Sequence, residues 1–341
     1  MGLSAYSGLN LFEKHKKGKK NLITDIEGVR VSHITLKQEN INTGVTVVFP
    51  HEGNIFQDKV MASSVVLNGF GKSVGLLQID ELGTIETPIV MTNTLSVGTA
   101  TTALIKYMLE QNKDIGITTG TVNCLVTECN DGRLNDIRGL HVTEEDVLRA
   151  LNSPSEYFEE GAVGSGTGMY CLGLKGGIGS ASRLIEVDGK EYTVGALVMS
   201  NFGSSGNLII GGDHIGRRIK ASTNNNKDEG SIIIIIGTDI PLSERQLKRV
   251  AKRSAISLGK TGSYMGNGSG DIAITFTTAN RIPHYSKSDI IETKMFFDDH
   301  IDKVFEASIE AVEESIISSL YHSETTVGFL GKEVKGLKEY L

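Results

Sequence analysis

The chain is poor in cysteine, proline and tryptophan: its 341 residues include three cysteines, five prolines and no tryptophan. The cysteines are Cys124, Cys129 and Cys171, an odd number without a C-x-x-C pair, which argues against a disulfide framework and for a reducing compartment. No apolar run reaches the roughly 18 residues of a membrane span. The first 20 residues lack an apolar core, so we expect no secretory signal and a cytoplasmic protein without membrane contact.

Positive charge is also scarce, because 34 basic residues face 41 acidic ones and the formal net charge is −7. This balance argues against nucleic acid as a partner. The single basic cluster, "EKHKKGKK" at 13–20, indicates a solvated arm, with an electrostatic tether to a polyanion as the alternative. The eight histidines are scattered and none lies at metal-ligand spacing. The sequence therefore predicts neither a metal site nor a cofactor.

Complete nucleotide-binding motifs are absent as well. Gly71-Lys72-Ser73 and Gly259-Lys260-Thr261 resemble the end of a P-loop, but Val66 and Ser254 stand where the first glycine is needed. The glycine-rich run at 164–182 never satisfies G-x-G-x-x-G. The 40 glycines of the chain instead indicate many tight turns and close approaches of the backbone.

Short β-rich runs alternate with helical patterns along the chain. Buried strands are predicted at 43–50, 89–93, 122–128 and 192–201. Helices are predicted at 96–111, after the N-cap Thr143, from the capping box Ser243-x-x-Gln246 to Gly259, and at 299–320. The order shows no regular β-α-β rhythm, which favours a layered α+β sandwich over a doubly wound sheet.

One junction stands out, "NNNKDEGSIIIIIGTD" at 224–239, where a polar stretch at 220–230 changes at once into five isoleucines. Gly-Ser occurs six times in the chain, so the dipeptide alone indicates only a turn. At this junction, however, Ser231 stands at the edge of a buried strand, where its hydroxyl could attack the preceding carbonyl. We therefore predict self-cleavage between Gly230 and Ser231, after which Ser231 is a nucleophile with its own α-amine as base.

A second motif lies in "NGSGDIAITFTTAN" at 267–280, a glycine-rich turn that enters an alternating strand. Side chains two residues apart in a strand point the same way, so Ser269 and Asp271 are expected to share a face. A hydroxyl backed by a carboxylate is a plausible relay beside a nucleophile. The alternative is a turn capped by Asp271.

These segments, with "TNTLSVGTA", "NDGRLND", "GSGTGMYCLGLKGGIGSASR" and "TVGALVMSNFG", resemble the L-aminopeptidase/D-amino-acid esterase–amidase family of self-processing serine aminopeptidases, which includes the β-peptidyl aminopeptidases. The resemblance runs from about Asn21 to the C-terminal end. It implies a four-layer αββα sandwich similar to N-terminal nucleophile hydrolases, usually as a homotetramer. It also implies an arm at 1–20 and one globular domain cut into an α chain, 21–230, and a β chain, 231–341.

The resemblance further implies roles for individual residues. Ser231 would be the nucleophile, Ser269 and Asp271 the supporting serine and acid, and Asn201 the amide that stabilises the oxyanion. Glu128 matches the position that holds the substrate ammonium group.

Asn130 departs from the family pattern, because relatives often carry an aromatic residue such as tyrosine at this position. That departure puts in doubt any tyrosine contact to the oxyanion, and we expect it to alter the substrate pocket.

The function expected from these residues is removal of N-terminal residues from short peptides, amino-acid amides or esters through an acyl-enzyme on Ser231. An acyltransferase on the same scaffold is one alternative, although such enzymes carry a threonine nucleophile where this chain has serine. A non-catalytic relative that has kept the sandwich is the other.

Overall fold

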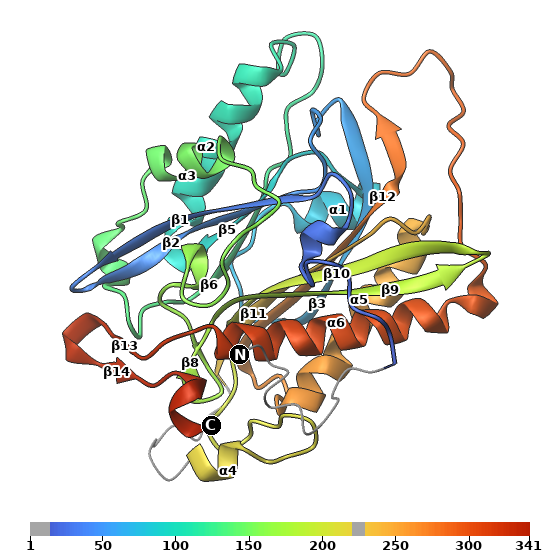
Figure 1. Cartoon of the computed structure of the whole chain (residues 1–341). Coiled ribbons are helices and arrows are strands. Elements are labelled where there is room, and N and C mark those ends of the chain that lie inside the picture. Colours follow the sequence, from blue (N-terminus) through green and yellow to red (C-terminus); the bar gives the residue numbers. More distant parts are fainter. Residues whose placement is uncertain (1–13, 220–228) are drawn as a thin grey trace.

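The computed structural model describes residues 14–219 and 229–341, so most of the predicted arm and most of the polar stretch at 220–230 lie outside the described residues. The chain folds into four layers, with two sheets face to face and helices on the outer face of each (Figure 1). Three clusters of buried apolar side chains fill the spaces between successive layers. This arrangement is the α+β sandwich expected from the sequence.

The first sheet has the order β1-β2-β5-β6, and two helices cover its outer face. The pairing of β5 with β6 is parallel and sets Thr92 beside Glu128 near the end of both strands. The bounds are β1 (Arg30–Gln38), β2 (Ile41–Phe49), β5 (Ile89–Asn93), β6 (Leu125–Cys129), α2 (Val97–Gln111) and α3 (Glu144–Leu151).

The second sheet has the order β4-β3-β12-β11-β10-β9, and two long helices cover its outer face. Its strands are β3 (Asp58–Gly69), β4 (Thr84–Ile85), β9 (Gly177–Val187), β10 (Lys190–Asn201), β11 (Glu229–Thr238) and β12 (Gly268–Pro283), with α5 (Glu244–Thr261) and α6 (Asp302–Tyr321). The short elements are α1 (Leu76–Leu82), α4 (Gly216–Ile219), β7 (Tyr170–Cys171), β8 (Leu174–Lys175), β13 (Thr326–Val327) and β14 (Glu333–Val334).

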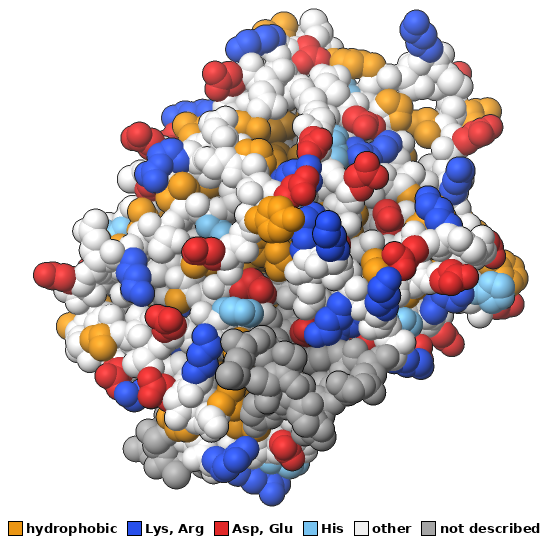
Figure 2. Space-filling model, viewed as in Figure 1, with side chains coloured by type: hydrophobic (Ala, Val, Ile, Leu, Met, Phe, Trp, Pro, Cys, Tyr) orange, Lys and Arg blue, Asp and Glu red, His pale blue; other side chains and the backbone are white. Residues whose placement is uncertain are grey.

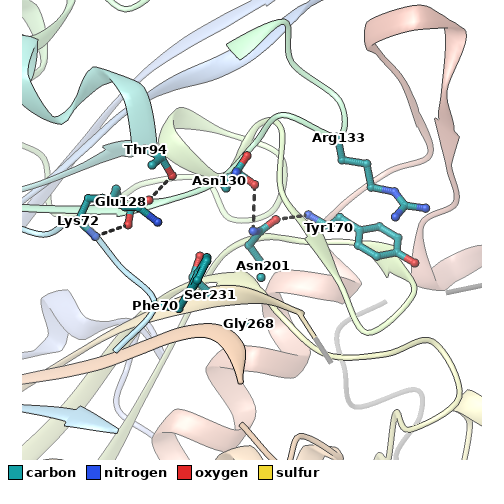
Figure 3. Close-up of a pocket in the computed structure, with 11 residues that line it drawn as sticks. Phe70, Lys72, Thr94, Glu128, Asn130, Arg133, Tyr170, Asn201, Ser231 and Gly268 are labelled. Atoms are coloured by element: carbon teal, nitrogen blue, oxygen red, sulfur yellow. Dashed lines mark hydrogen bonds between the residues drawn. The ribbon is translucent and has the colours of Figure 1, made fainter. Parts of the chain in front are cut away.

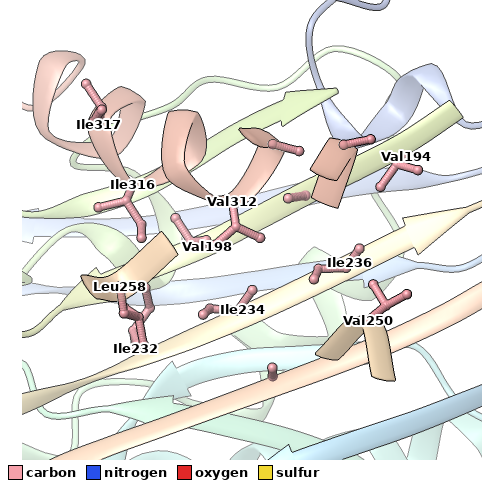
Figure 4. Packing of buried hydrophobic residues seen from close by; sticks show 14 of the residues in the cluster. Val194, Val198, Ile232, Ile234, Ile236, Val250, Leu258, Val312, Ile316 and Ile317 are labelled. Atoms are coloured by element: carbon pink, nitrogen blue, oxygen red, sulfur yellow. The ribbon is translucent and has the colours of Figure 1, made fainter. Parts of the chain in front are cut away.

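The five isoleucines form the centre of β11, which is buried on both faces. Ile232, Ile234 and Ile236 point toward α5 and α6, whereas Ile233 and Ile235 point toward the first sheet. Figure 4 shows the first set among the side chains Val250, Leu258, Val312 and Ile316. A strand covered on both faces needs apolar residues at every position rather than at alternate ones. The abrupt change in the sequence thus marks entry into the middle of the sandwich.

Helix α5 begins as predicted but ends later. The capping box is present: the Ser243 hydroxyl accepts from the backbone N–H of Gln246, and the side-chain oxygen of Gln246 accepts from the backbone N–H of Ser243. The helix continues through Gly259 and ends at Gly262, whose φ is 106°. Gly262 ends the helix because its N–H donates to the carbonyls of Leu258 and Gly259. To do so it adopts a left-handed conformation, which favours glycine.

Other boundaries shift by a few residues from the predicted ones. The strand predicted at 122–128 begins at Leu125, and the helix predicted from 299 begins at Asp302 after a 3₁₀ turn at Asp298–His300. These shifts leave the type and order of the elements unchanged.

The backbone of the described part of the basic segment lies against the body of the protein, while most of its lysine side chains are exposed to solvent. Lys17 Nζ is 2.6 Å from Glu314 Oε1 on α6, and the Lys16 carbonyl accepts from the Leu184 amide on β9. Glu314 Oε2 also accepts from the fully buried Arg183 at 2.6 Å. Because buried charges need partners, this cluster holds the start of the described chain on α6.

Charges of both signs are interspersed over the face seen in Figure 2, without an extended basic surface there. Within 14–219 and 229–341, no helix has the length and apolar character that a membrane crossing requires.

We expect Ile234→Ala to lower the free energy of unfolding by roughly 2–5 kcal/mol, because it opens a cavity in the middle of β11. Urea unfolding in a Ser231→Ala background, where the expected chain cleavage cannot occur, measures this loss. Leu77→Ala is the control, since Leu77 is 90% exposed and its loss should change stability by less than about 0.5 kcal/mol. Equal effects of the two substitutions would contradict the two-faced burial of β11.

Candidate active site

Ser231 is the first fully enclosed residue of β11 and lies at the end of the second sheet. It pairs with Asn201 of β10 on one side and with Gly270 of β12 on the other. Its side chain is 4% exposed and reaches a cavity of about 380 Å³ (Figure 3). The cavity wall is formed by Phe70, Lys72, Thr94, Glu128, Asn130, Arg133, Tyr170, Asn201, Gly230, Ser231 and Gly268. Five of the seven residues singled out in the sequence therefore meet at one place.

Gly230 occupies a position that only glycine fits. Its φ is +120°, a backbone conformation that residues with a side chain rarely adopt. A Cβ atom at Gly230 would lie 1.9 Å from the carbonyl oxygen of Asn201. The close approach brings the Gly230–Ser231 peptide directly against the end of β10.

The side-chain amide of Asn201 is held by two hydrogen bonds from opposite directions. Its Oδ1 accepts from the Tyr170 amide at 2.9 Å, and its Nδ2 donates to the Asn130 carbonyl at 3.0 Å. These contacts fix which end of the amide is nitrogen. An Asn side chain carries two N–H donors, so one remains for a group in the cavity.

Glu128 presents a buried carboxylate to the same cavity. One oxygen accepts from the Lys72 backbone amide at 2.8 Å, and the other accepts from the Thr94 hydroxyl. The residue is 3% exposed, and in the described chain no Lys, Arg or His forms an ion pair with it. A buried carboxylate held only by neutral donors is costly, so the site is suited to a cation supplied from outside.

Ser269 and Asp271 form the predicted pair but do not line the cavity. The Ser269 hydroxyl donates to Asp271 Oδ1 at 2.6 Å, and both residues are fully buried. They flank Gly270, the neighbour of Ser231 across the sheet. Since side chains alternate along a strand, the pair points to the opposite side of the sheet from the Ser231 side chain. The structure therefore sets them beside the Ser231 backbone rather than beside the cavity.

Several residues of the site were not singled out in the sequence. The Cys129 thiol lies beside the Ser231 side chain and donates to the Met199 carbonyl at 3.7 Å, while burial raises the pKa of the thiol well above the usual value. Phe70 and Lys72 come from the segment that fails as a P-loop. No spacing or motif in the sequence pointed to Cys129.

Tyr170 and Arg133 form another part of the wall that the sequence did not reveal. The guanidinium carbon of Arg133 lies 3.7 Å from the centre of the Tyr170 ring. Tyr170 belongs to strand β7 and Arg133 to the turn after β6, so only the folded arrangement brings them together. Tyr170 also supplies the backbone amide that orients Asn201.

A buried lysine holds the segment that leads into β7, the strand that carries Tyr170. Lys175 Nζ donates to the carbonyls of Gly166, Met169 and Gly176 at 2.6–3.1 Å. Burial lowers the pKa of Lys175 to about 7 and raises the pKa of Asp131, on the loop after β6, to about 7. The lysine contacts fix the backbone on the Tyr170 side of the Asn201 amide.

No group of three His, Cys, Asp or Glu side chains in the described part of the chain has the arrangement of a metal site. The cavity itself combines a hydroxyl, a fixed amide donor and a carboxylate. This set is the one required for acyl transfer, with a nucleophile, an oxyanion donor and an anchor for a substrate cation.

The fold and the family model define a peptidase related to N-terminal nucleophile hydrolases, and the chain belongs to peptidase family S58, whose model matches residues 21–334. The chain is 37% identical over 347 residues to a β-peptidyl aminopeptidase of Sphingosinicella microcystinivorans, covering 94% of this chain and 86% of that protein. The resemblance stated from the sequence motifs is thereby confirmed.

Solved structures agree with this assignment. A protein of Pyrococcus horikoshii OT3 is 52% identical with a TM-score of 0.93, covering 97% of this chain and 95% of that one. The L-aminopeptidase D-Ala-esterase/amidase of Ochrobactrum anthropi is 34% identical with a TM-score of 0.89, covering 95% and 93%. That enzyme is described as a prototype for the serine aminopeptidases and a new variant among the Ntn hydrolase fold.

The hydrogen bonds of Asn201 generate a pH-dependent prediction. In Asn201→Asp a carboxylate oxygen replaces Nδ2 and faces the Asn130 carbonyl, so repulsion and burial will raise the pKa of the new acid above its unfolded value of roughly 3.9. The folded variant then binds more protons than the unfolded chain, and its stability falls as pH rises above that value.

We expect the free energy of unfolding of Asn201→Asp to lie roughly 1–3 kcal/mol below that of its parent near pH 7.5, and this difference should shrink near pH 4.5. Urea unfolding at both pH values in the Ser231→Ala background measures it. The partly exposed Asn207, changed to Asp, is the matched control. A deficit independent of pH would show that Asn201 Nδ2 does not face a carbonyl.

Proposed function

We propose that this chain is an aminopeptidase that cuts itself between Gly230 and Ser231 and then uses Ser231 to remove N-terminal residues from short peptides, amides or esters. The observation that carries the proposal is the buried Glu128 carboxylate, which lacks a cationic partner in the described chain and shares a cavity with Ser231. An aminopeptidase must bind a free ammonium group, and a carboxylate is its natural partner.

The self-cleavage would proceed by acyl transfer within the backbone. The Ser231 hydroxyl oxygen attacks the Gly230 carbonyl carbon and loses its proton, the C–N bond breaks, and the Ser231 nitrogen takes up a proton to become an amine. Water then hydrolyses the resulting ester, which leaves a Gly230 carboxylate and a free Ser231 hydroxyl. The positive φ of Gly230 and its close approach to the end of β10 support this step, because they hold the Gly230–Ser231 peptide in one conformation beside Asn201.

Cleavage would create a base next to the nucleophile. The α-amine of Ser231, with an ordinary pKa of roughly 7.7–8.0, can accept the hydroxyl proton near neutral pH. The Ser269–Asp271 pair flanks the strand position beside the Ser231 backbone, so it is suited to orient that amine. The pair lies on the face of the second sheet opposite the Ser231 side chain, which fits a positioning role better than contact with substrate.

Turnover would follow the same chemistry with an external substrate. Glu128 binds the substrate ammonium, the Ser231 oxygen attacks the first carbonyl, and the free N–H of Asn201 stabilises the oxyanion. The leaving amine takes a proton, and water hydrolyses the acyl-enzyme. An added amine acceptor in place of water would give the acyltransferase alternative, which product analysis distinguishes.

We further propose a cytoplasmic homo-oligomer, a tetramer by family resemblance, consisting of an arm at 1–20, an α chain at 21–230 and a β chain at 231–341. The three cysteines are free and buried, which suits a reducing compartment. The segment between β12 and α6 extends from the body (Figure 1) and exposes Ile290, Met295 and Phe297. Exposed apolar side chains of this kind suit contact with another subunit.

The cleavage itself is tested by mass spectrometry of the purified protein. We expect fragments 1–230 and 231–341 from the wild type and an uncut chain from Ser231→Ala, which also lacks peptidase activity. Ser263→Ala is the matched control, because Ser263 follows a glycine outside the cavity and should leave cleavage intact. An uncut wild-type chain with full activity would overturn the proposal.

Glu128→Gln tests the ammonium anchor while keeping the shape of the side chain. We expect kcat/KM for an alanyl amide to fall roughly 10²-fold, because a buried charge pair of this kind contributes about 2–5 kcal/mol. Cleavage between Gly230 and Ser231 should persist, which separates lost binding from lost folding.

The wild type should also reject the N-acetylated amide, whose ammonium is absent. Glu110→Gln, on the exposed face of α2, is the control. If Glu128→Gln keeps both its rate and its preference for the free amine, the assignment of Glu128 is wrong.

A further inference from the structure

The Ser231 cavity has a cationic end that the proposed reaction does not use. Arg133 lies on the loop after β6 and lines the cavity, with its guanidinium stacked on the Tyr170 ring. The side chain is exposed, and no carboxylate of residues 14–219 and 229–341 lies within ion-pair distance of it. A stacked guanidinium is held in place while its N–H edges remain available to an anion.

The other cation of the cavity is placed differently. The Lys72 ammonium lies 4.6 Å from the centre of the Phe70 ring. The backbone amide of Lys72 donates to the Glu128 carboxylate. Lys72 is therefore on the Glu128 side of the cavity, whereas Arg133 is on the Tyr170 side (Figure 3). Of the cations that line the cavity in the described part of the chain, Arg133 alone stands at the end remote from the ammonium anchor.

The order of the groups along the cavity gives the orientation of a substrate. Figure 3 shows Glu128 at one end, Arg133 at the other, and Asn201 and Ser231 between them. A substrate whose ammonium binds Glu128 and whose first carbonyl meets Ser231 must extend its leaving portion away from Glu128, toward Arg133. In a dipeptide, that leaving portion is one residue with a free carboxylate.

The size of the cavity agrees with a short substrate. Its volume of about 380 Å³ is near the lower end of the range of roughly 300–1,000 Å³ for small-molecule sites. Opposite charges at the two ends match the zwitterion of a small peptide. A guanidinium binds a carboxylate through two parallel hydrogen bonds, which an amide terminus cannot replace.

We propose that Arg133 binds the free C-terminal carboxylate of a dipeptide, so that this chain prefers zwitterionic dipeptides to the corresponding dipeptide amides. This inference rests on the proposed aminopeptidase function and adds the class of substrate and a specificity-determining residue. It requires no new chemical step, because the carboxylate is bound and released unchanged with the leaving residue.

The test compares three substrates: alanyl-alanine, alanyl-alaninamide, and alanyl-glutamic acid amide, whose C-terminus is an amide and whose side chain is acidic. The N-terminal alanine of each is the L, D or β form that the enzyme hydrolyses fastest. For the wild type, kcat/KM should be roughly tenfold or more higher for alanyl-alanine than for alanyl-alaninamide, as expected for a hydrogen-bonded charge pair at a partly exposed site. Arg133→Leu should remove that preference and leave the rate on alanyl-alaninamide within about twofold.

Two further variants sharpen the result. Arg133→Lys keeps the charge but not the two parallel N–H groups, so it should retain part of the preference. Arg138→Leu removes an exposed guanidinium nearby that does not line the cavity, and it should retain all of it. Mass spectrometry confirms that each variant is processed like the wild type.

The outcomes separate this inference from the proposed function. Hydrolysis of none of the three substrates would refute the proposed function. Hydrolysis with equal loss on all three in Arg133→Leu would show a structural role and overturn the inference. A preference for alanyl-glutamic acid amide over alanyl-alanine would assign Arg133 to an acidic side chain instead. Loss of the preference in Lys72→Met but not in Arg133→Leu would also overturn it.

Discussion

The antiparallel pairing of β10 with β11 is the constraint on which the site depends. It sets Asn201 opposite Ser231 at the last position of the ladder, where the sheet ends and the cavity begins. A slip by one residue would exchange the two faces of β11, and because both faces carry isoleucine, the five isoleucines alone do not select one register. Gly230 restricts the register at the end of the strand, since only glycine can approach the Asn201 carbonyl so closely. The register fixed there determines which hydroxyl faces which amide.

The two sheets supply different parts of the chemistry. The second sheet carries the hydroxyl and the amide, whereas Glu128 comes from β6 of the first sheet, which contacts β11 across the interface. Its carboxylate accepts hydrogen bonds from an amide and a hydroxyl and forms no salt bridge with the described residues. Burial of a carboxylate without a cationic partner costs stability, and a bound cation would offset that cost. The same reasoning applies in weaker form to Arg133, which is more exposed and rests on an aromatic ring.

Sequence patterns predicted most helices and strands, and the buried strand after Ser231, because those features are local. A run of five isoleucines after a polar stretch is visible along the chain, and so are the capping box at Ser243 and the alternation after Ser269. The cavity was less accessible, because its wall joins segments that meet only when the two sheets pack. Asn201 and Glu128 entered through family resemblance, whereas Tyr170 and Arg133 had no signal in spacing or periodicity. The end of α5 was misplaced because two glycines were available and only the geometry of the cap chose Gly262.

The proposed self-cleavage and the proposed peptide hydrolysis would make different demands on this one cavity. The chain itself would deliver the Gly230 carbonyl to Ser231, so cleavage would need the hydroxyl, the glycine and the Asn201 amide but no charged anchor. A diffusing substrate has to be captured and oriented, and capture is what charges at the two ends of a cavity provide. Glu128 and Arg133 therefore have no evident purpose in the processing reaction. Their presence beside an already complete hydroxyl–amide pair is the physical reason to regard the cavity as built for an external, doubly charged molecule.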